Sequence, residues 1–172
     1  EMARPQTCSA GYNSLRFDDE LVRHGAYRNF HDAYEREWRG GNSRWDVLDA
    51  LRLMHALRPD GIVWRPREDG KGTSFRLEHL AEDNDLRIGD AHEALSDVRA
   101  TIGVARLFHT AQPRLWDYAL RLRDKRYAAS LLDVVQMTPL LHVSQRYPAA
   151  RLCAAPVIPL ARHPQIESQT IV

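Results

Sequence analysis

The sequence predicts an α/β domain followed by the beginning of a β-rich module, and three features indicate this order. A run of small and β-compatible residues from Thr7 to Tyr12 ends in a Gly-Tyr-Asn turn, as a strand does before a helix. The longest amphipathic pattern, from Ala91 to about His109, carries an apolar stripe that should cover a sheet. From Pro139 onward, short apolar runs alternate with prolines and polar turns, which is typical of strands.

The composition indicates an ordinary globular protein. Of the 172 residues, 44% are hydrophobic and 27% charged, so a sizeable core can form. The net charge of +1 gives no whole-chain signature of a nucleic-acid binder, and any basic surface must be local. Lys71 and Lys125 are the only lysines, so arginine supplies nearly all the positive charge. A guanidinium suits phosphate, but genomic base bias explains the imbalance equally well.

Neither a disulfide framework nor a zinc site is expected, because Cys8 and Cys153 are few and far apart. So few cysteines fit a reducing, cytoplasmic location. The longest apolar stretch, Leu152 to Ala161, contains two prolines and is shorter than the about 20 residues that span a bilayer, so no membrane role is predicted. Glu1 stands before Met2, and the apolar Thr170-Ile171-Val172 closes the chain, which leads us to expect an internal fragment.

Two further helices follow from apolar spacing. Residues Trp45 to Leu57 repeat apolar side chains at helical intervals, and Met54 among them is expected to serve packing. A shorter helix from Phe75 to Leu80 is expected after Ser74, which can cap it. Arg76 would then point outward.

Two acidic motifs each stand where a helix should begin. Asp18-Asp19-Glu20 complements the positive end of a helix dipole, and capping alone can explain it. In the second motif, Asp90 is a good N-cap and Glu93 its capping-box partner. His92 then lies in the first turn and Asp97 more than one turn onward.

Together these motifs resemble half of a two-metal nuclease site. Carboxylates hold divalent cations, and a histidine near its ordinary pKa can deprotonate water at neutral pH. The other half should be an Asp-x-Glu pair on a strand, and no such strand precedes Asp18 in this sequence. Asp18-x-Glu20 has the residue types and spacing of such a pair, but it begins a helix.

A locally basic segment follows Pro113 and contains Trp116 and Tyr118. Positive charge with aromatic rings suits single strands, because the charge follows the backbone while bases stack on the rings. The alternative is a solvated helix with Trp116 in the core. The charged residues of the segment are Arg114, Asp117, Arg121, Arg123, Asp124, Lys125 and Arg126.

The order of these motifs resembles the bacterial exonuclease I family of DEDDh exonucleases. The resemblance rests on Gly11-Tyr12-Asn13 with Phe17-Asp18-Asp19-Glu20, on Asn42 to Asp46, on Ser74 to Leu80, and on His92 with Asp97, and it extends to Pro164. It implies a ribonuclease H-like exonuclease domain over residues 1–112, incomplete at its N-terminus. The beginning of an SH3-like DNA-binding domain would occupy residues 113–172.

The family resemblance implies 3′-to-5′ hydrolysis of single-stranded DNA to nucleoside monophosphates, in DNA repair and recombination. Asp18 and Asp97 would be metal-binding carboxylates for two Mg²⁺ ions, with Mn²⁺ as the alternative, and His92 the general base. Asp19 stays open as the alternative to Asp18. The implied partners are single-stranded DNA and a single-stranded-DNA-binding protein, with a monomeric enzyme. The implied DNA-binding residues are Arg76 at the scissile end and Arg23, Tyr34, Trp38, Arg52 and Lys125 along the strand.

Two other functions fit parts of this pattern: another DEDDh nuclease that trims RNA or proofreads, and a non-catalytic single-strand-binding module. The basic segment and the β-rich end favour the exonuclease I family over the first. A binding module has no need of His92 and Asp97. Without the Asp-x-Glu pair, we expect this chain alone to be weakly active or inactive. We also expect the apolar stripe of the helix from Ala91 to His109 to lack much of its cover.

Overall fold

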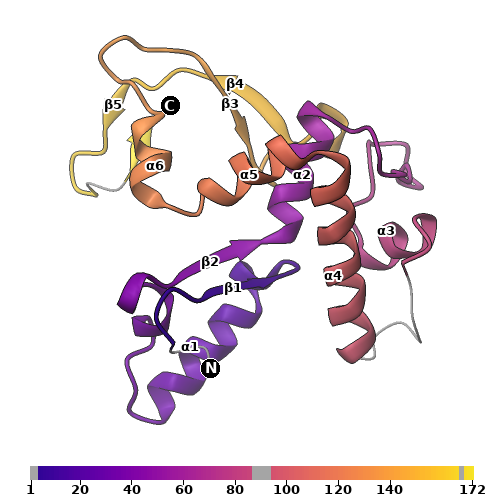
Figure 1. Cartoon of the computed structure of the whole chain (residues 1–172). Helices are drawn as coiled ribbons and strands as arrows, with labels where there is room; N and C mark the ends of the chain where they lie inside the picture. Colours follow the sequence, from indigo (N-terminus) through magenta and orange to yellow (C-terminus); the bar gives the residue numbers. More distant parts are fainter. Residues whose placement is uncertain (1–3, 87–93, 167–168) are drawn as a thin grey trace.

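The computed structural model describes residues 4–86, 94–166 and 169–172, and Figure 1 shows the arrangement of their helices and strands. Three short 3-10 turns lie between the first strands and a fourth lies near the C-terminus. In chain order the elements are β1 (Cys8–Gly11), η1 (Ser14–Arg16), α1 (Asp18–Arg28), η2 (Glu35–Glu37), η3 (Arg39–Gly41), β2 (Ser43–Asp46), α2 (Val47–Leu57), α3 (Leu77–Asp83), α4 (Ala94–Ala111), α5 (Pro113–Arg121), α6 (Lys125–Ser130), β3 (Leu140–Val143), η4 (Ala149–Arg151), β4 (Ala154–Val157), β5 (Ala161–Arg162) and β6 (Thr170–Ile171).

The N-terminal part is a strand, helix, strand unit. β1 pairs with β2 in parallel, with Cys8 opposite Ser43 and Gly11 opposite Asp46. Parallel neighbours need a crossover connection, and α1 lies in it. The predicted strand from Thr7 to Tyr12 is therefore confirmed as β1.

The core lies where α2, α4 and α5 meet. Leu51, Met54 and Phe108 are fully buried there, so the packing role predicted for Met54 is confirmed. Trp116 of α5 packs edge-on against Phe108 and against Trp45 of β2, at centroid distances of 5.4 and 4.8 Å. The core alternative for Trp116 is thus correct, and its ring is not part of an exposed basic face.

The helix predicted from Trp45 begins two residues later, at Val47. Trp45 and Asp46 belong to β2, and Asp46 caps α2 by accepting a hydrogen bond from the Leu48 amide at 3.0 Å. The short helix predicted from Phe75 likewise begins later, at Leu77. Ser74 is not its N-cap, although its Oγ accepts a long hydrogen bond of 3.4 Å from the Arg76 amide.

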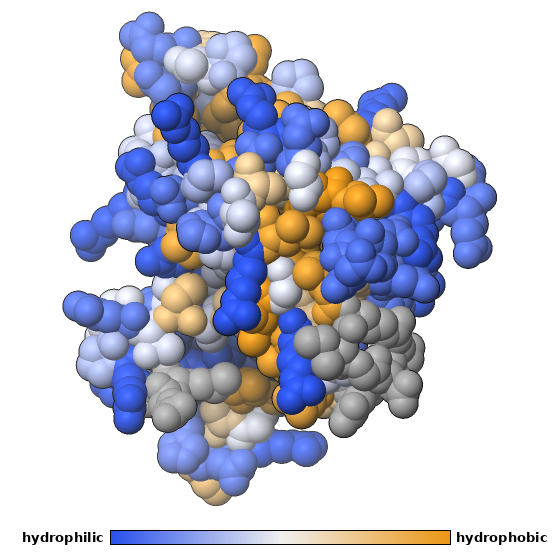
Figure 2. Space-filling view, turned by 45° about the vertical axis from the view of Figure 1, so that its right-hand side comes forward, coloured by the Kyte–Doolittle hydropathy of each residue, from blue (hydrophilic) through white to orange (hydrophobic). Residues whose placement is uncertain are grey.

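Helix α4 has two apolar faces, and only one of them is packed. Ala100, Val104 and Phe108 are buried against α2 and α5. Leu95, Val98 and Ile102 remain 52%, 54% and 45% exposed, so the predicted stripe is uncovered as expected. Figure 2 turns the side of the molecule that carries α4 toward the reader and shows a hydrophobic band between hydrophilic borders. Asp90, Ala91 and Glu93, in the predicted start of this helix, lie outside the described residues.

The C-terminal part contains the predicted strands. β3 and β4 pair antiparallel, with Leu140 opposite Val157. β5 and β6 form a second short antiparallel pair. The loop before α3 reaches this part, because Gly72, at φ +98°, lies so close to the backbone of Ala149 and Ala150 that no side chain fits there. None of the described helices is long and apolar enough to cross a membrane.

Candidate functional site

The turn between β1 and α1 is held by one buried carboxylate. Asp46 Oδ1 accepts the amide of Asn13 at 2.9 Å, and Oδ2 accepts the amide of Leu15 at 3.3 Å. Asn13 has a left-handed backbone at φ 59°, and a side chain on Gly11 would collide with Ser14. Burial raises the pKa of Asp46, against the lowering effect of these backbone hydrogen bonds. The residues just ahead of Asp18 are thereby fixed.

Asp18 and Asp19 are adjacent in sequence but differ in their surroundings. Asp19 is 6% exposed and accepts hydrogen bonds from Arg36 at 2.6 Å and Arg44 at 2.9 Å. Burial alone would raise its pKa, but the bonds and charges of the two guanidinium groups outweigh this and lower it. Asp18 is exposed, and no hydrogen bond or ion pair engages its side chain within the described residues. Of the pair, Asp18 is the carboxylate free to bind a cation.

Asp97, in the first turn of α4, is the second free carboxylate. It is exposed, and its side chain has no hydrogen bond or ion pair to any described residue. His92 lies outside the described residues. Within residues 4–86, 94–166 and 169–172, no three His, Cys, Asp or Glu side chains are grouped closely enough to hold a metal ion. Asp18 and Asp97 offer hard oxygen donors that suit Mg²⁺, but as an incomplete ligand set.

Arg23, Tyr34 and Trp38 gather near η2. The Arg23 guanidinium lies 4.9 Å from the centre of the Tyr34 ring and forms ion pairs with Glu37 at 2.7 Å and with Glu20. The hydrogen bond to Glu37 is the main reason that the pKa of Arg23 is raised. Tyr34 and Trp38 are 57% and 62% exposed, so they are not a core pair. A single 3-10 turn lies between them, so they do not share an α-helical face either.

Arg52 and Arg76 border one polar cavity of about 590 Å³. The cavity lies between α2, the loop before α3 and the segment around η4. Arg52 bonds Asp49 at 2.7 Å, while its Nε is buried without a hydrogen-bond partner in the described part of the chain. Arg76 is exposed and bonds Glu78 at 2.8 Å. The cavity thus presents guanidinium groups to a region large enough for a nucleotide.

The sequence did not single out two other residues of this cavity, Arg67 and Tyr147. They lie 80 residues apart on two loops, so no spacing signal could link them. Lys125 is exposed at the first position of α6 and borders neither this cavity nor the larger one.

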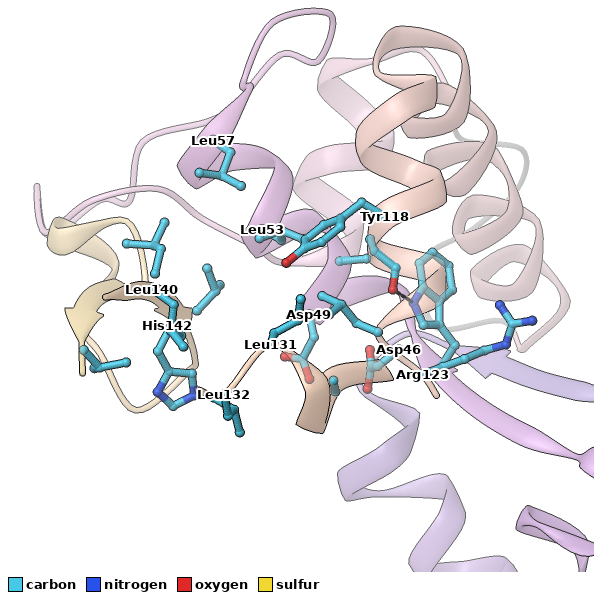
Figure 3. Close-up of a pocket in the computed structure, with 18 of the residues that line it drawn as sticks. Asp46, Asp49, Leu53, Leu57, Tyr118, Arg123, Leu131, Leu132, Leu140 and His142 are labelled. Atoms are coloured by element: carbon cyan, nitrogen blue, oxygen red, sulfur yellow. Dashed lines mark hydrogen bonds between the residues drawn. The ribbon is translucent and has the colours of Figure 1, made fainter. Parts of the chain in front are cut away.

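The larger cavity, of about 710 Å³, has a different character. Figure 3 shows Leu53 and Leu57 of α2 beside Tyr118 of α5, with Leu132 and Leu140 on the opposite side. Aliphatic side chains predominate in its lining. Tyr118 and Arg123 of the predicted basic segment border it, but none of the predicted metal-binding residues does. A phosphate would lose its hydration there with little compensation, so the smaller cavity is the better candidate for a charged strand.

Comparison with known proteins identifies relatives over almost the whole chain. Residues 123–172 match the family model of the exonuclease I SH3-like domain. Over 168 residues, 98% of this chain, the sequence is 49% identical to exodeoxyribonuclease I of Escherichia coli K12 and covers 35% of that protein. It is 45% identical over 172 residues to exodeoxyribonuclease I of Haemophilus influenzae, covering 36% of it. The chain spans roughly a third of the length of these curated relatives.

Solved structures agree with this match. E. coli exonuclease I in complex with a dA16 oligonucleotide has a TM-score of 0.90 and 49% identity, over 96% of this chain and 35% of that one. A zinc-bound E. coli ExoI–ssDNA complex has a TM-score of 0.90 and 48% identity, with the same coverage. An ExoI/SSB-Ct complex has a TM-score of 0.89 and 48% identity, again with the same coverage. The predicted fold class, an α/β part followed by an SH3-like module, is confirmed.

Proposed function

Since this chain is homologous to bacterial exodeoxyribonuclease I over nearly its whole length, we propose that it forms part of a 3′-to-5′ exonuclease. The substrate is single-stranded DNA, the products are nucleoside monophosphates, and the setting is DNA repair and recombination in the cytoplasm. The observation that carries the proposal is 49% identity over 98% of the chain to a named exodeoxyribonuclease.

The catalytic groups of this chain are Asp18, Asp97 and His92. Asp18 and Asp97 bind divalent cations through carboxylate oxygens, and their freedom from ion pairs within the described residues supports this role. His92 accepts the proton of the attacking water, which an imidazole can do at neutral pH. When bound, two Mg²⁺ ions, or Mn²⁺, supply Lewis acidity at the entering and leaving oxygens. The tie between Asp19 and two arginines supports Asp18 as the ligand.

The DNA strand follows a path across both parts of the chain, residues 1–112 and 113–172. Arg52 and Arg76 hold phosphates in the polar cavity, with Arg76 at the scissile end. The exposed rings of Tyr34 and Trp38 stack on bases, and Lys125 attracts the backbone. Arg23 orients Tyr34 through its ring contact. We further propose a monomeric enzyme that binds a single-stranded-DNA-binding protein.

A chimaera tests the proposal, because this chain covers 35% of the E. coli protein. The chain replaces the matching segment of E. coli exodeoxyribonuclease I, and the chimaera is first checked for cooperative unfolding. We expect Mg²⁺-dependent shortening of 5′-labelled single-stranded DNA. Asp18→Asn and Asp97→Asn should each lower the rate at least about 100-fold while DNA binding persists. The control Asp117→Asn, at an exposed aspartate of α5, should leave the rate unchanged. A folded chimaera without activity, or unchanged rates in both variants, contradicts the proposal.

The isolated 172-residue chain should show weak or no nuclease activity, because two carboxylates hold two cations poorly. The assay is the same, with the chimaera as positive control. Robust Mg²⁺-dependent activity of the isolated chain would show that this expectation is wrong. If instead the folded chimaera bound single-stranded DNA without cleaving it, and Asp97→Asn left that binding intact, a non-catalytic binding module would be the better description.

A further inference from the structure

Two charged residues of β2 hold the backbone on both sides of Asp18. Side chains on a strand alternate between its faces, so Arg44 and Asp46 project to the same side. Asp46 bonds the segment that precedes Asp18, and Arg44 bonds the residue that follows it. Asp18 lies between these two attachments without a side-chain bond of its own in the described part of the chain.

The upstream attachment is made by Asp46. Asp46 is 3% exposed and receives three amide bonds, from Asn13, Leu15 and Leu48. The first two fix the turn before α1, and the third fixes the start of α2. One carboxylate therefore ties the turn to the well-packed helix of the core.

The downstream attachment is an ion-pair network. Arg44 bonds Asp19 at 2.9 Å and Glu37 at 3.0 Å. Arg36 bonds the other oxygen of Asp19 at 2.6 Å. Because both oxygens of Asp19 are engaged, the first turn of α1 can neither rotate nor slide along β2 without breaking a charge-assisted bond.

We propose that Arg44 and Asp46 are positioning residues for the metal-binding carboxylate of Asp18. The proposal rests on the function proposed above and extends it to residues that do not touch the metal. Phe17, immediately before Asp18, has a backbone at φ −130° and ψ −71°, outside the helical region, so helix geometry alone does not orient Asp18. When a residue orients a metal ligand without touching the metal, its mutation typically lowers metal affinity or activity by about 10- to 100-fold.

The test separates a local positioning role from a general loss of stability. In the 172-residue chain, amide hydrogen exchange is measured by NMR in wild type, Asp46→Ala and Asp46→Asn, with Asp124→Asn as the matched control. Asp124 also caps a helix, α6, by accepting the amides of Arg126 and Tyr127, and in the described part of the chain it makes no bond to the turn before α1. Asp46→Ala should deprotect the amides of Asn13 and Leu15 more than those of the α4 core. Asp46→Asn should deprotect only Leu15, because a single amide oxygen remains.

The same samples are then titrated with Mn²⁺ alone, whose paramagnetism broadens the signals of nearby residues. Wild type and Asp124→Asn should show broadening around Asp18, and Asp18→Asn should abolish it. Asp46→Ala should need a Mn²⁺ concentration about 10-fold higher or more for the same broadening, and Asp46→Asn should be intermediate. Arg44→Gln should act in the same direction, with Arg65→Gln, which pairs with Asp83, as its control.

Each outcome decides the matter. Equal broadening in wild type and Asp46→Ala overturns the positioning role while leaving Asp18 as a metal ligand. Uniform deprotection of the turn and of α4 also overturns it, because Asp46 would then act only on overall stability. Absence of broadening around Asp18 in wild type overturns both the metal role of Asp18 and the positioning that depends on it.

Discussion

Helices α2 and α4 both carry apolar residues along their length but bury them differently. On α2, Leu48, Leu51 and Met54 are all buried, and the capping carboxylate of Asp46 receives three hydrogen bonds. On α4, one apolar face is buried while Leu95, Val98 and Ile102 are exposed. Its first-turn carboxylate, Asp97, has no partner among the described residues. The difference teaches that the apolar face of α2 serves the core, whereas α4 leaves one apolar face and one carboxylate available for contacts beyond the described residues.

The largest effect should come from the buried face of α4. Phe108→Ala removes a fully buried ring between α2 and α5 and should lower the free energy of unfolding by about 3 to 5 kcal/mol. Urea denaturation of the 172-residue chain measures this. A loss below about 1 kcal/mol would mean that neither face of α4 belongs to the core, which would contradict the comparison with α2 made above.

The carboxylates at the N-terminal ends of α2 and α4 should differ next. Asp46→Ala removes the cap of α2 and leaves two further amides without their acceptor, so the free energy of unfolding should fall by about 2 to 4 kcal/mol. Asp97→Ala, the matched change on α4, should cost no more than about 0.5 kcal/mol. Comparable losses in the two variants would contradict the view that the Asp97 side chain makes no stabilising contact with the described residues.

The same contrast recurs on α1 between Asp19 and Asp18. Asp19→Asn should cost about 1.5 to 3 kcal/mol, because the bonds from Arg36 and Arg44 lose their charge, while Asp18→Asn should cost little. The pKa of Asp19 is lowered in the folded chain, so its contribution is present above the unfolded value near 4 and disappears as the pH falls through the folded value.

Urea denaturation as a function of pH checks this prediction. Wild type should lose stability below about pH 4, and Asp19→Asn should lose less over the same range. If Asp18→Asn flattened the acid limb while Asp19→Asn did not, the assignment of the two carboxylates would be reversed.

The smallest effect should come from the exposed stripe. Val98→Ser and Ile102→Ser should change the free energy of unfolding by no more than about 0.5 kcal/mol, because both side chains are about half exposed already. The control is Ala100→Ser, which places the same hydroxyl on the packed face and should lower the free energy of unfolding more. A large loss from Val98→Ser would show that the stripe is covered in solution.

Local patterns predicted much of the fold. The turn after β1, the alternation around β3 and the stripe of α4 follow from neighbouring residues alone, and the structure contains all three. The start of α2 was missed because the apolar spacing extends back to Trp45. Asp46 is a cap because it accepts the Leu48 amide, and it is a strand residue because it pairs with Gly11 of β1; the spacing of apolar residues shows neither.

The candidate site was less accessible to sequence reasoning. Asp18 and Asp19 could not be separated, because what distinguishes them is the approach of Arg36 and Arg44, which lie 17 and 25 residues from Asp19. The cavity that unites Arg52 with Tyr147 is also a product of folding. The residue types indicated carboxylates for cations and guanidinium groups for phosphate. The choice of Asp18 over Asp19 required long-range contacts that only the folded chain shows.

The parallel pair of β1 and β2 has a practical consequence. In the described part of the chain, neither strand has a second neighbour, so each presents an open row of amide and carbonyl groups. Parallel pairs in stable proteins are normally enclosed, and open strand edges recruit strands of other copies. A preparation of this chain alone should therefore be kept dilute, because these edges favour self-association.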